Sequence, residues 1–357
     1  MTISIIMKKK TVLLLYSGYS TFVAKDIEMI KKGYNVIPYL FTPQKNLVGM
    51  MLEMFKQKMF LLVNIWKVDI VYSWFSDFHS FLPFLFAKML GKKTVVIVGG
   101  FDAVGIPELK YGLFHKKDLR QQFGIWSYKL SDYILPVDDS LINSMNYYVD
   151  PKGIKVGVDA YVPGLKAVIK TIPTGYNAAD WKVNTNKRDN SVVAFGYAAN
   201  MQRFVGKGYD FIIELAKKMP DVNFHLISIK DEMKSYAESL APDNVKITEG
   251  LPFDKLLDEL GRNKVYALFS VSEGFPSTVC EAMLCGCIPV GSNVGGIKNI
   301  IGDCGFVVNS KDLNQAEDAI RKALYAKPDL ANCGRERISN LFPSELREKE
   351  IFKILEI

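Results

Sequence analysis

The 357-residue chain has few cysteines and histidines and no long hydrophobic run. Its five cysteines all lie in the second half and include no Cys-x-x-Cys pair, which argues against a zinc site. The odd number of cysteines favours reduced thiols in a protein core over a disulfide framework. These residues are Cys280, Cys285, Cys287, Cys304 and Cys333. No apolar stretch reaches the roughly 18 residues that a membrane-spanning helix requires.

The first ten residues contain lysines, but no apolar segment ending in a small-residue cleavage site follows them. Such a segment is the mark of an export signal, so we expect no signal here. Together with the expectation of reduced cysteines, this predicts a cytoplasmic protein, with peripheral attachment to the inner face of the membrane as a further option.

Two common motifs are also missing. No Gly-x-Gly-x-x-Gly follows the first expected strand, which argues against a nicotinamide-dependent enzyme. No Asp-x-Asp motif is present, and we predict neither a bound metal ion nor a cofactor. What the chain does contain, 49% hydrophobic and 23% charged residues, is typical of a folded globular protein, and its length suggests two domains.

The net charge of +7 is concentrated in the first half of the chain. Residues 1–180 contain 22 lysines and arginines against 14 aspartates and glutamates, whereas residues 181–357 contain 23 against 24. A basic surface attracts anionic partners. An anionic membrane or a lipid-linked acceptor fits this charge better than nucleic acid, because no basic-aromatic binding module is visible. An ordinary solvated surface is the alternative.

The chain begins with a β-α-β pattern. The apolar run at residues 11–16 predicts a buried strand, a helix follows to about residue 32, and residues 33–40 predict the next strand. Ligands of parallel sheets bind at the carboxyl ends of the strands, and Gly18 lies at such an end. A further apolar run at residues 192–195 predicts the first strand of a second domain.

The most informative stretch begins with the apolar run at residues 265–271, which predicts another buried strand. A tight turn at residues 273–276 follows it, and a helix is expected from Ser277 to about Cys285. A helix that begins directly after a strand points free N–H groups and the positive end of its dipole at the edge of the sheet. Such a helix start is a ready site for an anion.

Two glutamates frame this turn. Glu273 precedes the helix and Glu281 lies about two turns along it, on the order of 10 Å away at 1.5 Å per residue. Taken alone, the pair is better explained by one glutamate that the helix dipole favours and one ordinary surface glutamate than by a ligand site. The wider segment resembles the Glu-x7-Glu signature of the family 4 retaining glycosyltransferases, also called glycosyl transferases group 1. The similarity includes the Glu-Ala-Met-x-Cys-Gly-x-x-Pro-Val sequence that begins at Glu281.

This resemblance implies the GT-B fold, an α/β architecture of two doubly wound Rossmann-like domains that face a central cleft. It implies an acceptor-side domain over residues 1–175 and a donor-binding domain over residues 176–342. Residues 343–357 would form a C-terminal helix that crosses back to the first domain. The implied donor is a UDP- or GDP-linked sugar, transferred with retention of configuration.

The resemblance also implies roles for individual residues. In the family the first glutamate, here Glu273, contacts hydroxyls of the donor sugar, and the second, here Glu281, holds the ribose. Residues 244–253 resemble the loop beside the nucleotide base and contain Leu251. The backbone expected to line the sugar and the phosphates belongs to Gly274, Phe275, Pro276, Ser277 and Thr278, and every residue of this segment except Pro276 has an N–H group to donate.

Arg203 and Lys207 lie in a glycine-containing segment before a helix predicted at residues 209–219. Two cations in this setting can neutralise a departing diphosphate. The resembling family has an arginine and a Lys-Gly pair in this segment, commonly five residues apart, whereas the separation here is four. Two solvated surface cations are the alternative interpretation.

A Gly-Gly-Phe-Asp sequence follows the strand predicted at residues 93–98. Glycines and an aspartate at the carboxyl end of a strand favour a functional loop, and we place Gly18 and Gly100 on the acceptor side. The family commonly has a histidine in this region that faces the donor sugar. This loop has none, and Asp102 is the nearest ionisable residue, which makes it the catalytic candidate in place of the histidine.

Residues 46–66 have apolar side chains at helical spacing and lysines around them. Packing against the core is the interpretation that this spacing favours. The alternative is a basic amphipathic helix that lies in a membrane interface.

We therefore predict a metal-independent retaining hexosyltransferase that acts on a glycan or lipid-linked acceptor in cell-envelope polysaccharide or glycolipid synthesis. Two other functions stay open. One is a GT-B module that binds a sugar nucleotide without turnover, which the missing histidine and the Lys298-Asn299 pair after the double glycine both favour. The other is an epimerase or hydrolase that acts on a nucleotide sugar.

Overall fold

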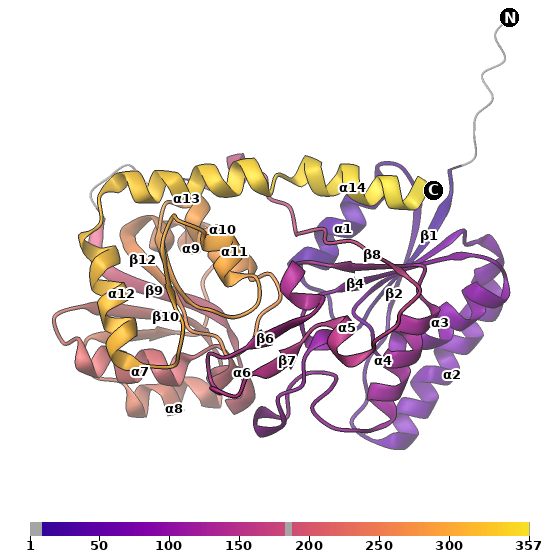
Figure 1. The fold of residues 1–357 in the computed structure, drawn as a ribbon, viewed down its shortest axis with the longest axis horizontal. Coiled ribbons are helices and arrows are strands. Elements are labelled where there is room, and N and C mark those ends of the chain that lie inside the picture. Colours follow the sequence, from indigo (N-terminus) through magenta and orange to yellow (C-terminus); the bar gives the residue numbers. More distant parts are fainter. Residues whose placement is uncertain (1–8, 183–187, 357) are drawn as a thin grey trace, which may run out of the picture.

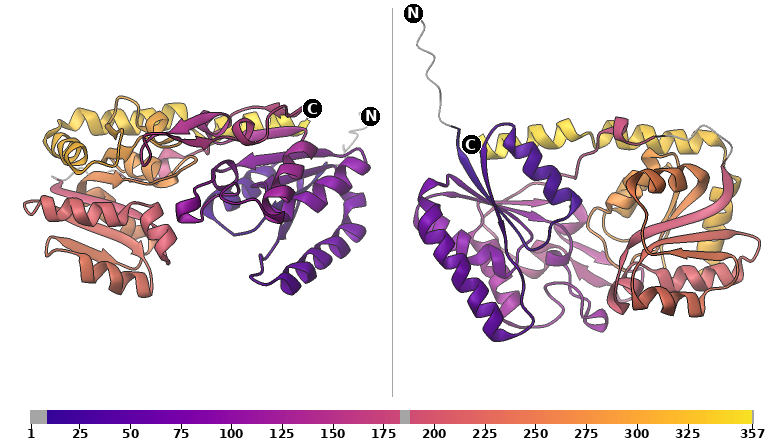
Figure 2. Two further views of the ribbon diagram at one scale, coloured as in Figure 1. Left: turned by 60° about the horizontal axis from the view of Figure 1, so that its bottom comes forward. Right: turned by 180° about the vertical axis from the view of Figure 1, so that it is seen from behind.

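The computed structural model describes residues 9–182 and 188–356. The first eight residues, in which we expected no export signal, lie outside the described residues. Two parallel sheets lie side by side, each with helices on both faces (Figures 1 and 2). The chain has the predicted GT-B architecture of two doubly wound Rossmann-like domains.

The N-terminal sheet has six parallel strands in the order β2-β1-β3-β4-β5-β8. Its inner strands are continuous runs of β-branched and other apolar residues, as expected for strands covered on both faces. The strands are β1 (Thr11–Tyr16), β2 (Asn35–Leu40), β3 (Ile70–Trp74), β4 (Lys93–Val98), β5 (Tyr133–Pro136) and β8 (Val168–Ile169). The helices are α1 (Thr21–Lys31), α2 (Leu47–Asn64), α3 (Phe78–Met89), α4 (Leu119–Leu130) and α5 (Val158–Tyr161).

Short elements complete this domain. An antiparallel hairpin is formed by β6 (Ser144–Asn146) and β7 (Ile154–Val156). Single 3₁₀ turns occur at η1 (Ile65–Lys67), η2 (Phe101–Ala103), η3 (Pro107–Leu109), η4 (Asp139–Leu141) and η5 (Ala178–Asp180). The loops that carry η2 and η3 follow the carboxyl end of β4, on the side that faces the other domain (Figure 1).

The C-terminal sheet also has six parallel strands, in the order β11-β10-β9-β12-β13-β14. Its strands are β9 (Asp189–Ala198), β10 (Asn223–Ile229), β11 (Val245–Thr248), β12 (Asn263–Leu268), β13 (Ile288–Ser292) and β14 (Phe306–Val308). Its helices are α6 (Met201–Gly206), α7 (Tyr209–Lys218), α8 (Glu232–Leu240), α9 (Phe253–Arg262), α10 (Ser277–Leu284), α11 (Ile297–Ile301) and α12 (Leu313–Tyr325). Because β9 and β12 are parallel neighbours, the segments that follow their carboxyl ends begin beside each other.

Two helices in line, α13 (Pro328–Leu341) and α14 (Ser344–Glu356), join the domains along one side of the molecule (Figure 1). The Arg347 guanidinium of α14 donates two hydrogen bonds to the Asp26 carboxylate of α1, at 2.8 and 2.7 Å, and both side chains are buried. Removing one partner of such a pair leaves a buried charge uncompensated, which typically costs about 3–5 kcal/mol. This pair therefore fixes α14 to the N-terminal domain.

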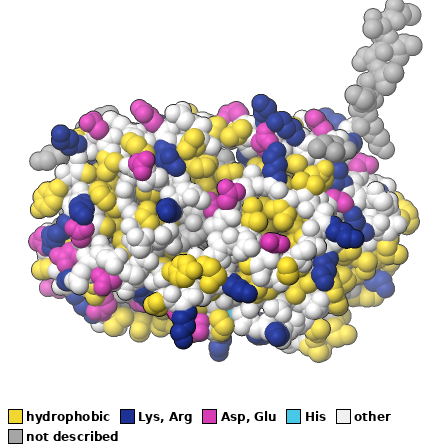
Figure 3. Space-filling view, in the orientation of Figure 1, with side chains coloured by type: hydrophobic (Ala, Val, Ile, Leu, Met, Phe, Trp, Pro, Cys, Tyr) yellow, Lys and Arg dark blue, Asp and Glu magenta, His cyan; other side chains and the backbone are white. Residues whose placement is uncertain are grey.

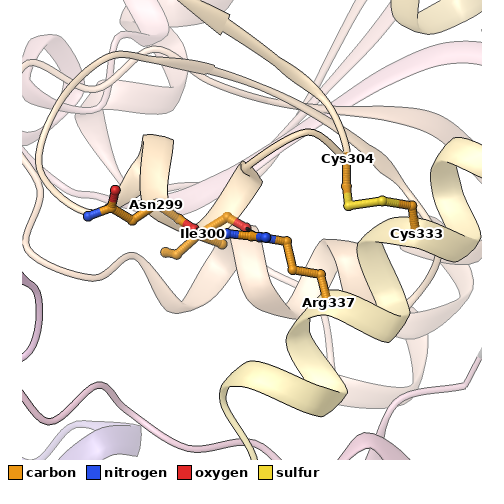
Figure 4. Close-up of a disulfide and its surroundings, with 5 residues drawn as sticks. All are labelled: Asn299, Ile300, Cys304, Cys333 and Arg337. Atoms are coloured by element: carbon orange, nitrogen blue, oxygen red, sulfur yellow. Dashed lines mark hydrogen bonds between the residues drawn. A yellow bond between two sulfur atoms is a disulfide. The ribbon is translucent and has the colours of Figure 1, made fainter.

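The prediction that all cysteines are reduced is wrong for two of them. Cys304 and Cys333 form a disulfide with a Cα–Cα distance of 5.4 Å, which joins the turn after α11 to α13 (Figure 4). In the same contact Arg337 of α13 donates to the carbonyls of Asn299 and Ile300, at 2.7 and 2.9 Å. The two cysteines are 29 residues apart, and only the packing of α13 against α11 brings them together. The other three cysteines are free and buried.

The prediction that residues 46–66 pack into the core is also wrong. The side chains of α2 that are buried are Glu53, Gln57 and Leu61, while most of its apolar side chains are exposed. Among the described residues, no helix is both long enough and apolar enough to cross a membrane.

Candidate active site

The turn before α10 and the segment before α7 lie in direct contact. The Val271 N–H donates to the Gly206 carbonyl at 2.9 Å. Gly208 has φ +75°, and a Cβ there would lie 2.2 Å from the Phe269 carbonyl oxygen. Glycine is therefore required where the two segments cross. This crossing places Lys207 of one segment against Glu273 of the other.

Lys207 and Glu273 form a close ion pair. The lysine Nζ lies 2.6 Å from Oε1 of Glu273, and the same oxygen accepts a hydrogen bond from Ser270 Oγ at 2.7 Å. The Glu273 side chain is 11% exposed and the Lys207 side chain 30%. Two donors thus hold Oε1, and no partner of Oε2 occurs within the described residues. One carboxylate oxygen remains to accept a hydrogen bond from a ligand.

Glu273 and Lys207 open into a cavity of about 420 Å³ between the two domains. Arg203 lines the same cavity, so three of the predicted site residues are brought together. Residues from both domains form its wall: Ser17, Phe75, Asp77, Gly99, Phe101, Ile106, Leu109, Tyr111, Arg120, Gln202, Gly206, Val271 and Ser272. The volume is within the range typical of small-molecule sites, and interdomain clefts are a common place for them.

Arg203 is exposed, and its guanidinium stacks over the Tyr197 ring at 5.2 Å. Within the described part of the chain it forms no ion pair, whereas Lys207 is paired with Glu273. The cavity therefore has one cation held by a carboxylate and a second one that is open to an anionic ligand.

The start of α10 has no side-chain cap. Phe275 is buried with its ring 5.0 Å from that of Phe342, and Pro276 is buried beside it. Ser277 and Thr278 are half-exposed, and Thr278 Oγ1 accepts a hydrogen bond from Tyr266 at 2.7 Å. The turn is thus held by apolar contacts on its buried side, and the first N–H groups of the helix remain for a ligand.

Glu281 lies away from this cavity, on the side of α10 that faces the domain link. Burial raises its pKa to about 7, and the nearby Lys25 ammonium opposes that rise. Lys25 belongs to α1 of the other domain, and its Nζ lies 4.5 Å from the centre of the Tyr176 ring. A pKa in this range makes the charge of the carboxyl group sensitive to a bound ligand near neutral pH.

Asp102 does not reach the cavity. Its side chain is fully buried, and its two oxygens accept hydrogen bonds from the N–H groups of Ser76, Gly99 and Gly100, at 3.0–3.2 Å, and from the Tyr128 hydroxyl at 3.0 Å. Burial raises its pKa to about 6 in spite of these donors. We therefore correct the catalytic assignment of Asp102, because its buried carboxylate is bound by three backbone N–H groups and the Tyr128 hydroxyl, positions the loop, and does not line the cavity.

The glycine loop after β4 touches the turn that carries Glu273. A Cβ at Gly274 would lie 2.1 Å from the Gly99 carbonyl oxygen, and a Cβ at Gly100, where φ is +123°, would lie 2.9 Å from the Gly274 nitrogen. Gly100 therefore contacts the donor side of the cleft. Gly18 is exposed with open space around it, and its neighbour Ser17 lines the cavity instead.

Leu251 lies in the loop between β11 and α9, half-buried against the C-terminal core and outside the cavity. Of the predicted site residues, the structure places Glu273, Lys207 and Arg203 at the cavity. The other predicted residues lie in the turn before α10, along α10, and in loops outside the cavity.

Three residues of the cavity were missed by the sequence analysis. Burial raises the pKa of Tyr111, and the neighbouring Glu273 carboxylate adds to the rise. Arg120 donates to both oxygens of Asp77, at 2.8 and 3.1 Å through Nε, and stacks over the Phe101 ring. Gln202 donates to the Leu109 carbonyl across the domains at 2.8 Å. These contacts join elements that are far apart in the chain, so local residue spacing gives no sign of them.

Within residues 9–182 and 188–356, no group of three or more His, Cys, Asp or Glu side chains is placed to hold a metal ion.

Comparisons with known proteins relate the chain to glycosyltransferases. Residues 184–338 match the family model described as glycosyl transferases group 1. The chain is 25% identical over 303 residues to N-acetyl-alpha-D-glucosaminyl L-malate synthase of Bacillus anthracis, covering 78% of this chain and 72% of that protein.

Two solved structures have a similar fold over nearly the whole chain. Sucrose-phosphate synthase of Thermosynechococcus elongatus gives a TM-score of 0.73 at 13% identity, with 98% of both chains covered. Anabaena HepE in complex with UDP and glucose gives a TM-score of 0.70 at 14% identity, with 98% of this chain and 100% of that one covered.

Proposed function

We propose that this chain, which carries a group 1 glycosyltransferase domain on a GT-B fold, transfers a hexose from a UDP- or GDP-sugar to a glycan or lipid-linked acceptor. The observation that carries the proposal is the pairing of Lys207 with Glu273 in the interdomain cavity, with Arg203 beside it. A carboxylate and two cations at the start of a helix match a ligand with sugar hydroxyls next to a diphosphate.

In the proposed complex Glu273 orients the sugar. Its Oε1 is fixed by Lys207 and Ser270, so Oε2 accepts a hydrogen bond from a sugar hydroxyl. A carboxylate acceptor of this kind gives a stronger hydrogen bond than a neutral one. The sugar is thereby held in one position at the mouth of the acceptor side.

Arg203 and Lys207 stabilise the departing diphosphate. Negative charge grows on the bridging oxygen as the bond to the sugar breaks, and preorganised cations lower the free energy of that state more than that of the ground state. The uncapped N–H groups at the start of α10 add to this effect. With these groups the reaction does not need a metal ion, and we propose metal-independent transfer with retention of configuration.

The acceptor enters from the N-terminal domain, which supplies most of the cavity wall opposite Glu273. The excess of 22 basic over 14 acidic residues in residues 1–180 supports an anionic or lipid-linked acceptor. We accordingly place the protein in cell-envelope polysaccharide or glycolipid synthesis at the cytoplasmic side.

The test is transfer or hydrolysis of UDP-glucose, UDP-N-acetylglucosamine and GDP-mannose, followed as release of the nucleoside diphosphate. Glu273→Gln and Lys207→Ala should each lower kcat/KM on the order of 100-fold, the usual cost of one preorganised group. The matched control is Lys217→Ala, which breaks the exposed pair of Lys217 with Glu214, 2.7 Å apart, and should keep full activity. Wild-type rates in both site variants would refute the assignment.

One observation favours a second candidate, a module that binds the sugar nucleotide without turnover. The loop after β4 has no histidine, and the Asp102 carboxylate accepts hydrogen bonds from backbone N–H groups instead of facing the cavity. Binding of a nucleotide sugar without product from any acceptor would support this candidate. Product formed with no acceptor present would instead support an epimerase or hydrolase.

A further inference from the structure

The helix α2 and the turn η1 that follows it present an apolar surface to solvent. Nine of their apolar side chains are between 44% and 70% exposed: Leu47, Val48, Met51, Leu52, Phe55, Met59, Leu62, Val63 and Trp66. Six of them recur at alternating steps of four and three residues, from Val48 to Trp66, so they share one face of the helix. Figure 3 shows hydrophobic side chains gathered at the lower right, where Figure 1 places α2. We call this face the outer face of α2.

The opposite face of α2 attaches the helix to the domain through polar groups. Gln57 is fully buried and donates to the His79 carbonyl at 2.8 Å, and Glu53 accepts from the Thr42 N–H at 3.3 Å. A helix that turns glutamate and glutamine inward and leucine, phenylalanine and tryptophan outward is the reverse of an ordinary surface helix. The fold itself therefore makes no use of the outer face, and large exposed apolar surfaces mark interaction sites.

The charges around the outer face all have one sign. Residues 45–67 contain four lysines and a single acidic residue, Glu53, which is buried. At 100° per residue Lys58 and Lys56 fall at opposite borders of the apolar stripe. Lys45 precedes the helix and Lys67 ends η1, and all four lysines are exposed. Lys56 lies 3.6 Å from the Glu53 carboxylate, whereas Lys45, Lys58 and Lys67 form no ion pair among the described residues. An anionic surface is the complement of such a rim, because an apolar protein partner alone would leave these three charges without a counterpart.

We propose that the outer face of α2 seats the N-terminal domain on an anionic lipid bilayer. The apolar stripe would lie among the acyl chains near the headgroups, with the lysines beside the lipid phosphates. Trp66 marks the end of the stripe, and its indole N–H donates to the Leu62 carbonyl at 3.0 Å, so its ring can be buried without an unpaired donor.

The position of α2 connects this surface with the site. A second cavity, of about 500 Å³, begins at Lys45 and Met50, at the start of α2, and is lined also by Lys116. It shares Asp77 and Arg120 with the cavity that contains Glu273. On the basis of the proposed function, an acceptor anchored in the bilayer would pass this cavity on the way to the donor sugar.

The test uses the full chain and vesicles that contain phosphatidylcholine with 30% phosphatidylglycerol. Sedimentation should show binding of the wild type to these vesicles, weak binding to pure phosphatidylcholine, and a steep fall with added salt. The variant Phe55→Glu/Leu62→Glu should bind at least roughly tenfold more weakly, because two carboxylates would enter the apolar stripe. The control Tyr325→Glu changes an equally large exposed side chain, 79% exposed on α12, and should bind like the wild type.

Three outcomes overturn the proposal: no binding by the wild type, equal binding by the α2 variant and the Tyr325 control, or a dimer that the α2 variant abolishes without any vesicle binding. The last would make a second copy of the chain the occupant. Melting temperature and binding of nucleoside diphosphate should be unchanged in the α2 variant. A failure of the membrane proposal with normal nucleotide binding is therefore separate from a failure of the proposed glycosyl transfer.

Discussion

At the scale of single residues, the site combines groups that are fixed with groups that can respond. Glu273 has one oxygen bound by Lys207 and Ser270, so its orientation is set before a ligand arrives. Glu281 is different, because burial raises its pKa to about 7 and the Lys25 ammonium of the other domain opposes that rise. The charge of this residue can therefore change near neutral pH when a ligand binds.

Donor binding should therefore depend on pH through Glu281. A ribose hydroxyl that donates to the carboxylate favours the ionised form, so affinity should rise with pH up to about 7 and level off above it. Below that value the dissociation constant should increase up to tenfold per pH unit. Calorimetric titration of UDP or GDP between pH 5.5 and 8.5 measures this profile, and Glu281→Gln should flatten it.

The same group affects stability in the opposite sense. A carboxyl group whose pKa is raised in the folded state binds its proton more tightly there than in the unfolded chain. Its contribution to stability is thus lost as pH rises from the ordinary value of 4.5 to about 7. Glu281→Gln should raise Tm at pH 8 and have little effect at pH 4.5. A Tm change that is equal at both pH values would argue against a raised pKa.

The sequence predicts the role of a residue where a short local motif indicates that role. The spacing of Glu273 and Glu281 and the setting of Lys207 are readable, since both depend on a strand that ends at a turn. Asp102 was misjudged because its backbone partner Ser76 comes from a different loop. Tyr111 and Arg120 were missed for the same reason, as their contacts cross between elements far apart in the chain.

At the scale of elements, the site depends on the approach of two glycine turns. Gly274 lies against the Gly99 carbonyl, and Gly296 N–H donates to the Gly274 carbonyl at 2.7 Å. The turn that carries Glu273 is therefore enclosed between the loop after β4 and the start of α11. No side chain has room at this crossing.

Gly274→Ala tests this arrangement. The added methyl group would meet the Gly99 oxygen at 2.1 Å and must push the two loops apart. A displacement of about 1 Å at a reacting group can cost on the order of 100-fold in rate, so a fall of that size in kcat is expected. Gly18→Ala is the control, since a Cβ there meets nothing within 4 Å. Equal activities of the two variants would contradict the proposed turn geometry.

The disulfide between Cys304 and Cys333 also depends on how secondary-structure elements pack. A crosslink that closes a loop of 29 residues should stabilise the C-terminal domain by about 3–4 kcal/mol through the unfolded chain. Reduction, or Cys333→Ser, should lower Tm accordingly, and Cys285→Ser should serve as a control without this loss of a crosslink.

Alkylation under denaturing conditions counts the thiols directly. Three cysteines should react before reduction and five after it. Five reactive thiols in the unreduced protein would exclude the disulfide. From the sequence, an odd number of cysteines without a paired motif pointed the other way, because pairing depends on how α13 packs over α11.

At the scale of the whole molecule, the two domains meet through specific contacts. The Gln202 side chain donates to two carbonyls of the opposite loop, and Asn299 donates to Asp138 at 2.9 Å. Together with the Arg347–Asp26 pair, these bonds hold the cavity between the domains. The GT-B fold could be predicted because the segment from Glu273 to Val290 resembles a known family, and the β-α-β pattern at the start of the chain is consistent with it. The exposure of the outer face of α2 could not be predicted, because helical spacing shows that apolar side chains share one face but not whether that face points to the core or to solvent.

The central claim is that a diphosphate binds between Arg203, Lys207 and the start of α10. Calorimetric titration with UDP, GDP and ADP tests it most directly, in the wild type and in the double variant Arg203→Ala/Lys207→Ala. We predict that one of the three binds the wild type and that the double variant binds it at least roughly 100-fold more weakly, because each charge-assisted contact contributes about 1.5–3 kcal/mol. Equal affinity in both proteins, or no binding of any nucleotide to the wild type, would contradict the claim.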